Sequence, residues 1–203
     1  MSIQLHKRDL PDGLDLGPSV AIDTETMGLN LARDRLCLVQ LSAGDGAAHL
    51  VQVDRADPRA PNLTRLLADE RVLKIFHFAR FDVAALKLTF GVTARPVYCT
   101  KIASRLVRTF TDRHGLKDLT KDLINVDLSK QQQSSDWGAA ELSQEQLSYA
   151  ASDVLHLHTL KARLDEMLAR EGRTHLAAAC FAFLPFRAEL DLAGWADQDI
   201  FQH

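Results

Sequence analysis

The sequence has few cysteines, no long hydrophobic run and no surplus of positive charge, and each shortage excludes a class of protein. Among its 203 residues, Cys37, Cys99 and Cys180 are the three cysteines, and they lie far apart in apolar contexts. They indicate buried thiols in a reducing cytoplasm rather than a disulfide framework or a zinc site. No apolar run approaches the roughly 20 residues of a membrane span, and the first residues lack an apolar signal region. We therefore expect a cytoplasmic protein that does not enter a membrane.

The charge balance limits the kind of partner. The formal net charge is −3, so the chain has no overall basic excess. A protein that holds long nucleic acid by its backbone usually has such an excess, because phosphate neutralisation supplies much of the affinity. The balance favours a short substrate or a small local basic patch, although metal ions at a site would add positive charge of their own. Hydrophobic residues make up 46% of the chain, which at this length predicts one packed domain over 1–203.

Short apolar runs bounded by turn residues predict the secondary structure. Strands are predicted at 19–23, 36–42, 48–53, 72–76 and 97–99, with a hairpin-type turn at 44–46. Helices are predicted at about 61–68, 81–88, 100–107 and 116–124, and an ordered loop at 130–137. Ser143 and Gln146 form a capping box, from which one apolar-striped helix is predicted to continue until Gly172. The pattern predicts an α/β domain with a central mixed five-stranded sheet flanked by helices.

Four carboxylates and one tyrosine follow apolar runs, where a globular protein normally avoids charge. Asp23 and Glu25 are two residues apart, so both side chains leave the same face of an extended strand. Asp82 follows another strand at the start of a helix. Tyr149 and Asp153 are four residues apart on the capped helix and share one of its faces. We expect these groups to converge on one acidic pocket.

Such a pocket points to metal chemistry. Four neighbouring carboxylates cannot all stay ionised without cations, and hard oxygen ligands suit Mg²⁺, with Mn²⁺ as a substitute. Two ions about 3.5–4 Å apart can bracket a scissile phosphate. A tyrosine with a pKa of about 10 is a poor general base, so Tyr149 is expected to orient the attacking water. Each residue alone has an ordinary structural explanation, but the joint arrangement indicates metal-dependent nucleic-acid hydrolysis.

Three segments of the chain resemble the motifs of the DEDDy 3′–5′ exonucleases of the RNase D group, within the RNase H-like superfamily. The segments are 21–26, 76–82 and 149–153, and the stretches 114–119 and 133–137 also resemble RNase D. The resemblance covers a catalytic core of about residues 15–170. It implies that the catalytic metal ligands are Asp23, Glu25, Asp82 and Asp153, and that Tyr149 positions the nucleophilic water.

Two departures from RNase D narrow the resemblance. Phe78 stands where RNase D usually has asparagine, and the chain ends too soon for the C-terminal RNA-binding domains of long RNase D proteins. With the continuation at 27–30, these features resemble nano-RNase C, a short alphaproteobacterial relative. That resemblance implies a cytoplasmic homo-oligomer, an octameric ring, that degrades short RNA oligonucleotides and especially diribonucleotides such as pGpG.

Two other functions were weighed against this one. One is a broader RNase D-like exonuclease that trims RNA or DNA ends. The other is a module that binds 3′ ends without cleaving them, which the intact carboxylate set and Tyr149 argue against.

The resemblance also implies residues that bind substrate. Thr24, Met27 and Gly28 lie where family members contact the 3′-terminal nucleotide. Leu29 matches an apolar wedge between the last two bases, and its alternative is a core leucine on a turn.

Further candidates come from the residues around the motifs. His77 and Phe81 flank the second motif, and His77 is either a ligand for phosphate or sugar or a packed histidine. The densest basic cluster comprises Arg108, Arg113, His114 and Lys117. It is a candidate to capture the 5′ phosphate of a short substrate or to guide a strand into the pocket, with a solvated loop as the alternative.

The last segment, 172–203, is rich in aromatic residues, namely Phe181, Phe183, Phe186, Trp195 and Phe201. Aromatic side chains are enriched at protein interfaces, so this helical tail is expected to form an oligomer interface. Packing against the core of the same chain is the alternative.

Overall fold

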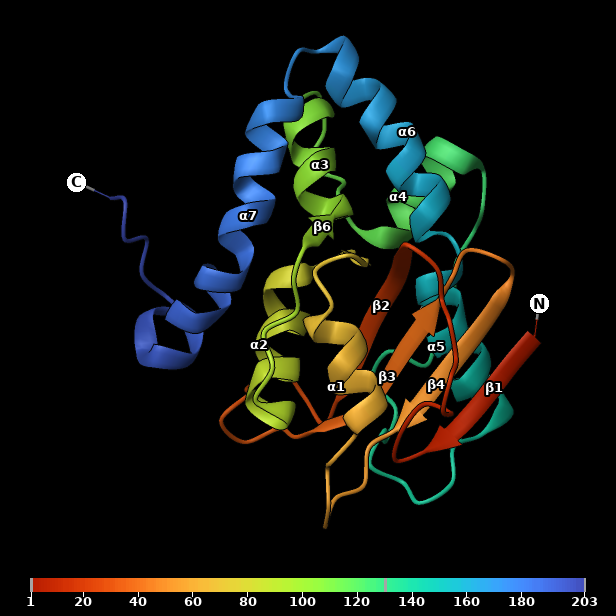
Figure 1. Ribbon diagram of the computed structural model, residues 1–203. Coiled ribbons are helices and arrows are strands. Elements are labelled where there is room, and N and C mark those ends of the chain that lie inside the picture. The colour runs from red at the N-terminus through yellow and green to blue at the C-terminus, as the bar shows by residue number, and fades with distance from the viewer. Residues whose placement is uncertain (1, 130, 203) are drawn as a thin grey trace.

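The computed structural model describes residues 2–129 and 131–202. Six strands form one mixed sheet in the order β1-β4-β3-β2-β5-β6 (Figure 1). β3 is antiparallel to both β2 and β4, whereas the pairs β1–β4, β2–β5 and β5–β6 are parallel. The strands are β1 (Ser2–Lys7), β2 (Ser19–Thr26), β3 (Leu36–Ser42), β4 (Ala47–Gln52), β5 (Leu73–Phe76) and β6 (Val97–Cys99).

The prediction of five strands was wrong by one, because β1 was missed. The side chains of β1 are exposed or only partly buried, so the segment has no continuous apolar run. It becomes a strand by pairing along its whole length with the edge of β4. β2 also continues past Asp23, where the predicted strand ended, to Thr26. Glu25 therefore lies in the strand as well.

Helices cover both faces of the sheet. In Figure 1, α1 and α2 lie over one face, α5 lies behind the other, and α3, α6 and α7 lie beyond one end. The helices are α1 (Pro61–Ala68), α2 (Ala79–Phe90), α3 (Thr100–Val107), α4 (Leu116–Ile124), α5 (Gln144–Leu155), α6 (Leu157–Arg170) and α7 (Thr174–Leu190), followed by a π-helical turn, η1 (Asp191–Trp195).

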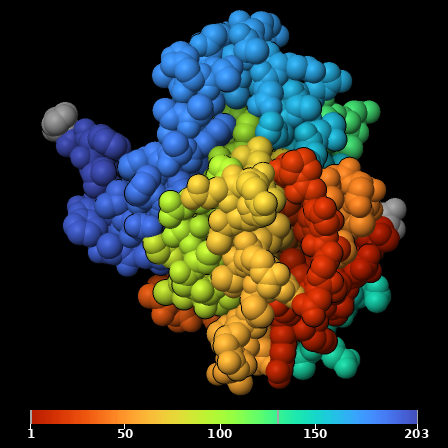
Figure 2. Space-filling view, in the orientation of Figure 1, coloured from red at the N-terminus to blue at the C-terminus, as the bar shows by residue number. Residues whose placement is uncertain are grey.

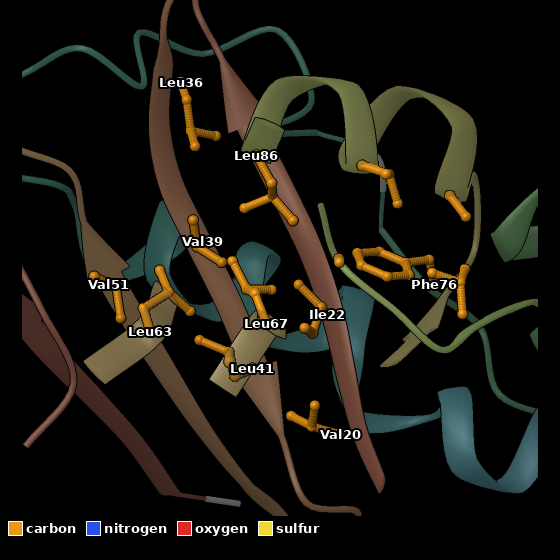
Figure 3. Packing of buried hydrophobic residues seen from close by; sticks show 14 of the residues in the cluster. Val20, Ile22, Leu36, Val39, Leu41, Val51, Leu63, Leu67, Phe76 and Leu86 are labelled. Carbon is orange, nitrogen blue, oxygen red and sulfur yellow. The ribbon is translucent and has the colours of Figure 1, made fainter. Parts of the chain in front are cut away.

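Alternate residues of β2 enter two different cores. Val20 and Ile22 face α1 and α2, where Leu63, Leu67 and other apolar side chains surround them (Figure 3). Ala21 belongs to the second core, with α5 and α6. Because side chains alternate between the faces of a strand, Asp23 and Glu25 continue the row of Ala21 and emerge on the α5 side.

The single helix predicted after Ser143 is two helices. The capping box is present, and the predicted apolar stripe is buried along both α5 and α6. The chain bends at His156, which is the C-cap of α5 and the N-cap of α6. The bend lets α5 pack on β2, β3 and β4, while α6 turns away to pack on α3 and α4.

The loop prediction at 130–137 agrees with the turns over 131–135, and Lys130 lies outside the described residues.

The aromatic tail is divided between core and surface. Phe181 packs on Tyr98 with ring centroids 4.5 Å apart, whereas Phe186 and Phe201 are exposed. Figure 2 shows the dark blue end of the chain projecting from the side of the molecule, whereas η1 packs on α2 and α7. Within the described residues, no helix is long and apolar enough to cross a membrane.

Candidate active site

The acidic pocket forms where β2 ends beside α5. Asp23 and Glu25 come from β2, and Asp153 comes from the last turns of α5. One carboxylate oxygen from each of the three lies within 4.8 Å of the other two. The spacing of two on a strand and the position of Asp153 on its helix therefore produce the cluster that the sequence predicts.

Asp82 reaches the same site from the opposite face of β2. It lies in the first turn of α2 and is buried. The Thr24 hydroxyl donates a hydrogen bond of 2.6 Å to Asp82 Oδ1. Thr24 was predicted to contact substrate, and what the structure shows is that its side chain binds the Asp82 carboxylate.

Burial and mutual repulsion make these carboxylates weak acids in the absence of cations. Burial, reinforced by Asp82, Asp153 and Glu25, raises the pKa of Asp23 well above its usual value. Burial and the neighbouring carboxylates raise the pKa of Glu25 to about 9. Burial also raises the pKa of Asp82 and that of Asp153 to about 7. At neutral pH the site therefore holds excess protons that a cation would displace.

Tyr149 lies between the carboxylate cluster and the side chain of Trp137. Its ring lies 6.0 Å from that of Trp137, measured between centroids, and it lines the same cavity as Asp153, one turn further along α5. Burial first, and then the neighbouring carboxylates, raises the pKa of Tyr149 above its ordinary value. The phenol therefore keeps its proton, so it suits orienting a water better than abstracting a proton.

A cavity of about 570 Å³ opens over the cluster, within the size range of small-ligand sites. All four predicted metal ligands and Tyr149 line it. So do six of the seven predicted substrate-binding residues: Thr24, Met27, Gly28, Leu29, His77 and Phe81. Arg113 is not among the lining residues.

The turn after β2 forms one rim of the cavity. Leu29 is 85% exposed, which excludes the alternative that it is a core leucine. Gly28 lies against Asp34, where a Cβ atom would meet Asp34 Oδ2 at 2.4 Å, so a side chain at this position would force Asp34 to move. Leu29 follows directly in the chain and lies at the mouth of the cavity, where its side chain is not packed in a core.

His77 and Phe78 form part of the opposite wall. His77 Nδ1 and Thr100 Oγ1 are 2.9 Å apart, and burial lowers the pKa of His77 to about 3. A neutral imidazole offers a phosphate no positive charge. Lys101 supplies that charge instead, because it lines the cavity with its Nζ 4.3 Å from the centroid of the Phe78 ring.

The four residues of the predicted basic cluster have different partners in the structure and do not form one phosphate-binding group. Arg108 is buried and pairs with Asp122, while His114 Nδ1 lies 2.8 Å from Ser104 Oγ. Arg113 pairs with Asp118 and Asp122 at 3.2 and 3.1 Å, which explains why it does not reach the cavity. Of the four, Lys117 alone is among the residues that line it.

Sequence reasoning missed Lys101 as a site residue. The available signal was its position just after β6, since Asp82 likewise lies on a helix that follows a strand. Trp137 and its preceding loop residues also line the cavity, although only their likeness to RNase D was recognised.

The donor set fits a magnesium-type cation. Asp23, Glu25 and Asp153 present only carboxylate oxygens, which Mg²⁺ prefers. Their crowding in a partly buried site needs positive charge to keep all three ionised. No thiol or imidazole belongs to this group of ligand atoms, so the set does not resemble a zinc site.

Known proteins match this chain at the level of sequence. A family model described as 3′-5′ exonuclease matches residues 8–169. Ribonuclease D from Gluconacetobacter diazotrophicus is 39% identical over 170 residues, which cover 82% of this chain and 42% of the relative. Ribonuclease D from Granulibacter bethesdensis is 37% identical over 161 residues, or 77% of this chain and 39% of the relative. The chain thus spans about two fifths of the length of these curated relatives.

Solved structures match over the whole chain. Brucella melitensis NrnC with bound Mg²⁺ is 57% identical, with a TM-score of 0.96 and coverage of 100% of both chains. Brucella melitensis NrnC bound to pGG is 58% identical, with a TM-score of 0.97 and coverage of 100% of this chain and 99% of the other. These matches confirm the RNase H-like exonuclease fold predicted from the motifs, with six strands in place of five. By its family match, its curated relatives and its fold, the chain belongs to the 3′-5′ exonuclease family and, within it, to the ribonuclease D group.

Proposed function

We propose that this protein is a metal-dependent 3′–5′ exoribonuclease that hydrolyses short RNA oligonucleotides, and diribonucleotides such as pGpG above all, to nucleoside 5′-monophosphates. One observation carries the proposal: a single cavity joins the carboxylate cluster and Tyr149 to the exposed apolar side chain of Leu29. The likeness over the whole chain to NrnC bound to pGG supports the choice of substrate.

The reaction breaks the bond between phosphorus and the leaving O3′ and forms a bond from phosphorus to the oxygen of water. Asp23, Glu25, Asp82 and Asp153 would hold two Mg²⁺ ions, with Mn²⁺ as a substitute. Bound there, the ions would lower the pKa of the attacking water and offset the charge of the phosphodiester. Tyr149, which stays protonated beside Asp153, would orient that water for attack. The products are a nucleoside 5′-monophosphate and a 3′ hydroxyl on the remaining nucleotide.

The other cavity residues would hold the nucleotides. Leu29 would insert between the two bases, since stacking of bases on side chains is common in RNA recognition. Thr24, Met27 and Gly28 would contact the terminal nucleotide from the floor and rim of the cavity. Lys101 and Lys117 would face the phosphates, in place of the predicted Arg113.

The deciding experiment compares 5′-labelled pGpG with a seven-nucleotide RNA at equal concentration, in Mg²⁺ and in EDTA. We expect faster turnover of the dinucleotide, mononucleotide products, and no cleavage in EDTA. Asp23→Asn serves as the inactive control. Equal or slower turnover of the dinucleotide would favour the broader RNase D-like exonuclease, and binding without cleavage would favour a 3′-end binding module.

We also propose that the tail forms an interface between copies of this chain, in a ring-like homo-oligomer whose octameric order comes from the resemblance to nano-RNase C. Phe186 and Phe201 are 58% and 68% exposed, and both rings lie near Phe183, which joins them into one apolar surface. An apolar surface of this kind is typical of an interface.

Changing Phe186 and Phe201 to glutamate should dissociate the oligomer, because it places charge in the apolar surface. Light scattering at micromolar concentration measures this directly. Phe110→Glu is the matched control, since Phe110 is an exposed phenylalanine outside the tail. A monomeric wild-type protein would contradict the interface.

We also propose a location in the cytoplasm. The three cysteines, which form no disulfide among the described residues, are consistent with it.

A further inference from the structure

Gln40 is a fully buried polar residue whose carboxamide is unpaired. It lies in the middle of β3 and is 0% exposed. Neither Nε2 nor Oε1 has a hydrogen-bond partner among the described residues. Burying an amide in this way is costly, and such a group usually has a partner in the protein or in an ordered water.

The sheet register places Gln40 beside the active site. Gln40 is the antiparallel partner of Asp23, and its neighbour on the other side is Leu50 of β4. Side chains of directly opposed residues leave the same face of a sheet with their Cβ atoms roughly 5 Å apart. Leu38, two residues earlier on β3, packs in the core beneath α5 with Leu50. The Gln40 amide therefore lies on the α5 side of the sheet, next to the Asp23 carboxylate.

The surroundings limit what the amide can bind. Leu38 and Leu50, together with Ala150 and Ala151 of α5, are apolar members of this core, which also contains Trp137, whose buried indole N–H has no partner among the described residues. Asp23 is the polar side chain that the register places directly opposite. An internal water needs two or more polar partners, and the amide nitrogen, the amide oxygen and the Asp23 carboxylate provide them.

We propose that Gln40 is a positioning residue for Asp23, acting through one internal water hydrogen-bonded to the Gln40 carboxamide and the Asp23 carboxylate. This bridge fixes the direction in which Asp23 presents its other oxygen to a metal ion. Partners behind a metal ligand commonly change metal affinity by 10- to 100-fold when they are removed. The proposal rests on the metal-dependent function proposed above.

Gln40→Met tests this role, because methionine is similar in shape and removes only the amide. We expect Mg²⁺ affinity, measured by calorimetry, to fall at least about tenfold. The melting temperature of the metal-free protein should change little, because methionine fills the same space and opens no cavity. Leu50→Met is the matched control: it lies on the other side of Gln40, and its Mg²⁺ affinity should equal that of the wild type.

The possible outcomes separate this role from a merely structural one. Mg²⁺ affinity of Gln40→Met within twofold of wild type, with normal cleavage, overturns the positioning role and leaves the proposed function intact. If the wild type neither binds Mg²⁺ nor cleaves RNA, the proposed function itself fails. Should Gln40→Met not fold, a high-resolution crystal structure of the wild type decides: density bridging Gln40 and Asp23 supports the proposal, and its absence overturns it.

Discussion

Tyr149 has a raised pKa and packs against Trp137, and both properties bear on its role. It lines the cavity beside Asp153, and burial and the neighbouring carboxylates raise its pKa. Its ring is held against Trp137, which limits its motion. A protonated, immobilised phenol orients a water but adds no ligand charge to a metal site.

Tyr149→Phe should therefore slow hydrolysis while leaving Mg²⁺ binding unchanged. We expect kcat to fall by about 10²-fold, since a misplaced reacting group can cost that much. Single-turnover kinetics and calorimetry measure the two properties. Tyr98→Phe is the matched control, because the Tyr98 hydroxyl bonds Asp165 and does not line the cavity. A loss of Mg²⁺ binding in Tyr149→Phe would contradict the role.

Leu29 is an exposed apolar residue at the mouth of the cavity, so its substitution should affect substrate and not stability. Leu29→Ala should raise KM for a dinucleotide about tenfold, because base stacking contributes about 1–3 kcal/mol per base. Its melting temperature should match that of the wild type. Leu176→Ala, at another exposed leucine on α7, controls for loss of surface apolar area. An unchanged KM would show that Leu29 does not act as a wedge.

At the scale of elements, α5 carries both Tyr149 and Asp153. The capping box that begins this helix therefore helps to position both side chains. The Ser143 side chain accepts from the Gln146 backbone N–H, and the Gln146 side chain accepts from the Ser143 backbone N–H. The box was recognised in the sequence because its two residues are local, three positions apart. The bend at His156 was not, because the apolar stripe continues through it without a glycine or proline.

Ser143→Ala should lower the free energy of unfolding by about 1 kcal/mol, the usual contribution of an N-cap side chain. Urea unfolding measures the change. Ser148→Ala is the matched control on the same helix, because Ser148 is exposed and alanine favours helix. Equal stability of the two variants would show that the box does not stabilise α5.

At the scale of the whole molecule, folding brings together carboxylates whose repulsion must be offset by protons or cations. In the folded, metal-free protein the pKa of Glu25 is about 9, and those of Asp82 and Asp153 are about 7. In the unfolded chain all three are about 4. The folded state therefore binds more protons between these limits, and this cluster's contribution to stability falls as the pH rises through them.

The gain in melting temperature on adding Mg²⁺ should therefore be larger at about pH 8.5 than at about pH 6, because protons compete with the metal at the lower pH. Thermal unfolding with and without Mg²⁺ at the two pH values measures it. In Asp153→Asn, which removes one of the titrating ligands, the difference between the two gains should shrink. Equal gains in the wild type at both values would contradict the raised pKa values.

Much of the candidate site could be predicted because its signals are local. Asp23 and Glu25 share a strand face through a spacing of two, and Tyr149 and Asp153 share a helix face through a spacing of four. Carboxylates at these spacings are typical of metal-dependent phosphodiester chemistry, so the sequence by itself determined the acidic residue set and the family.

Only the tertiary structure decided which distant residues complete the site. Arg113 and Lys101 are both basic, but the fold of the segment 108–122 pairs the first with Asp118 and Asp122, whereas the second lines the cavity. β1 becomes a strand only through the free edge of β4, and Gln40 meets Asp23 only through the register of two strands. Local periodicity reports which face a side chain occupies, whereas contacts between segments far apart in the chain depend on the assembled sheet.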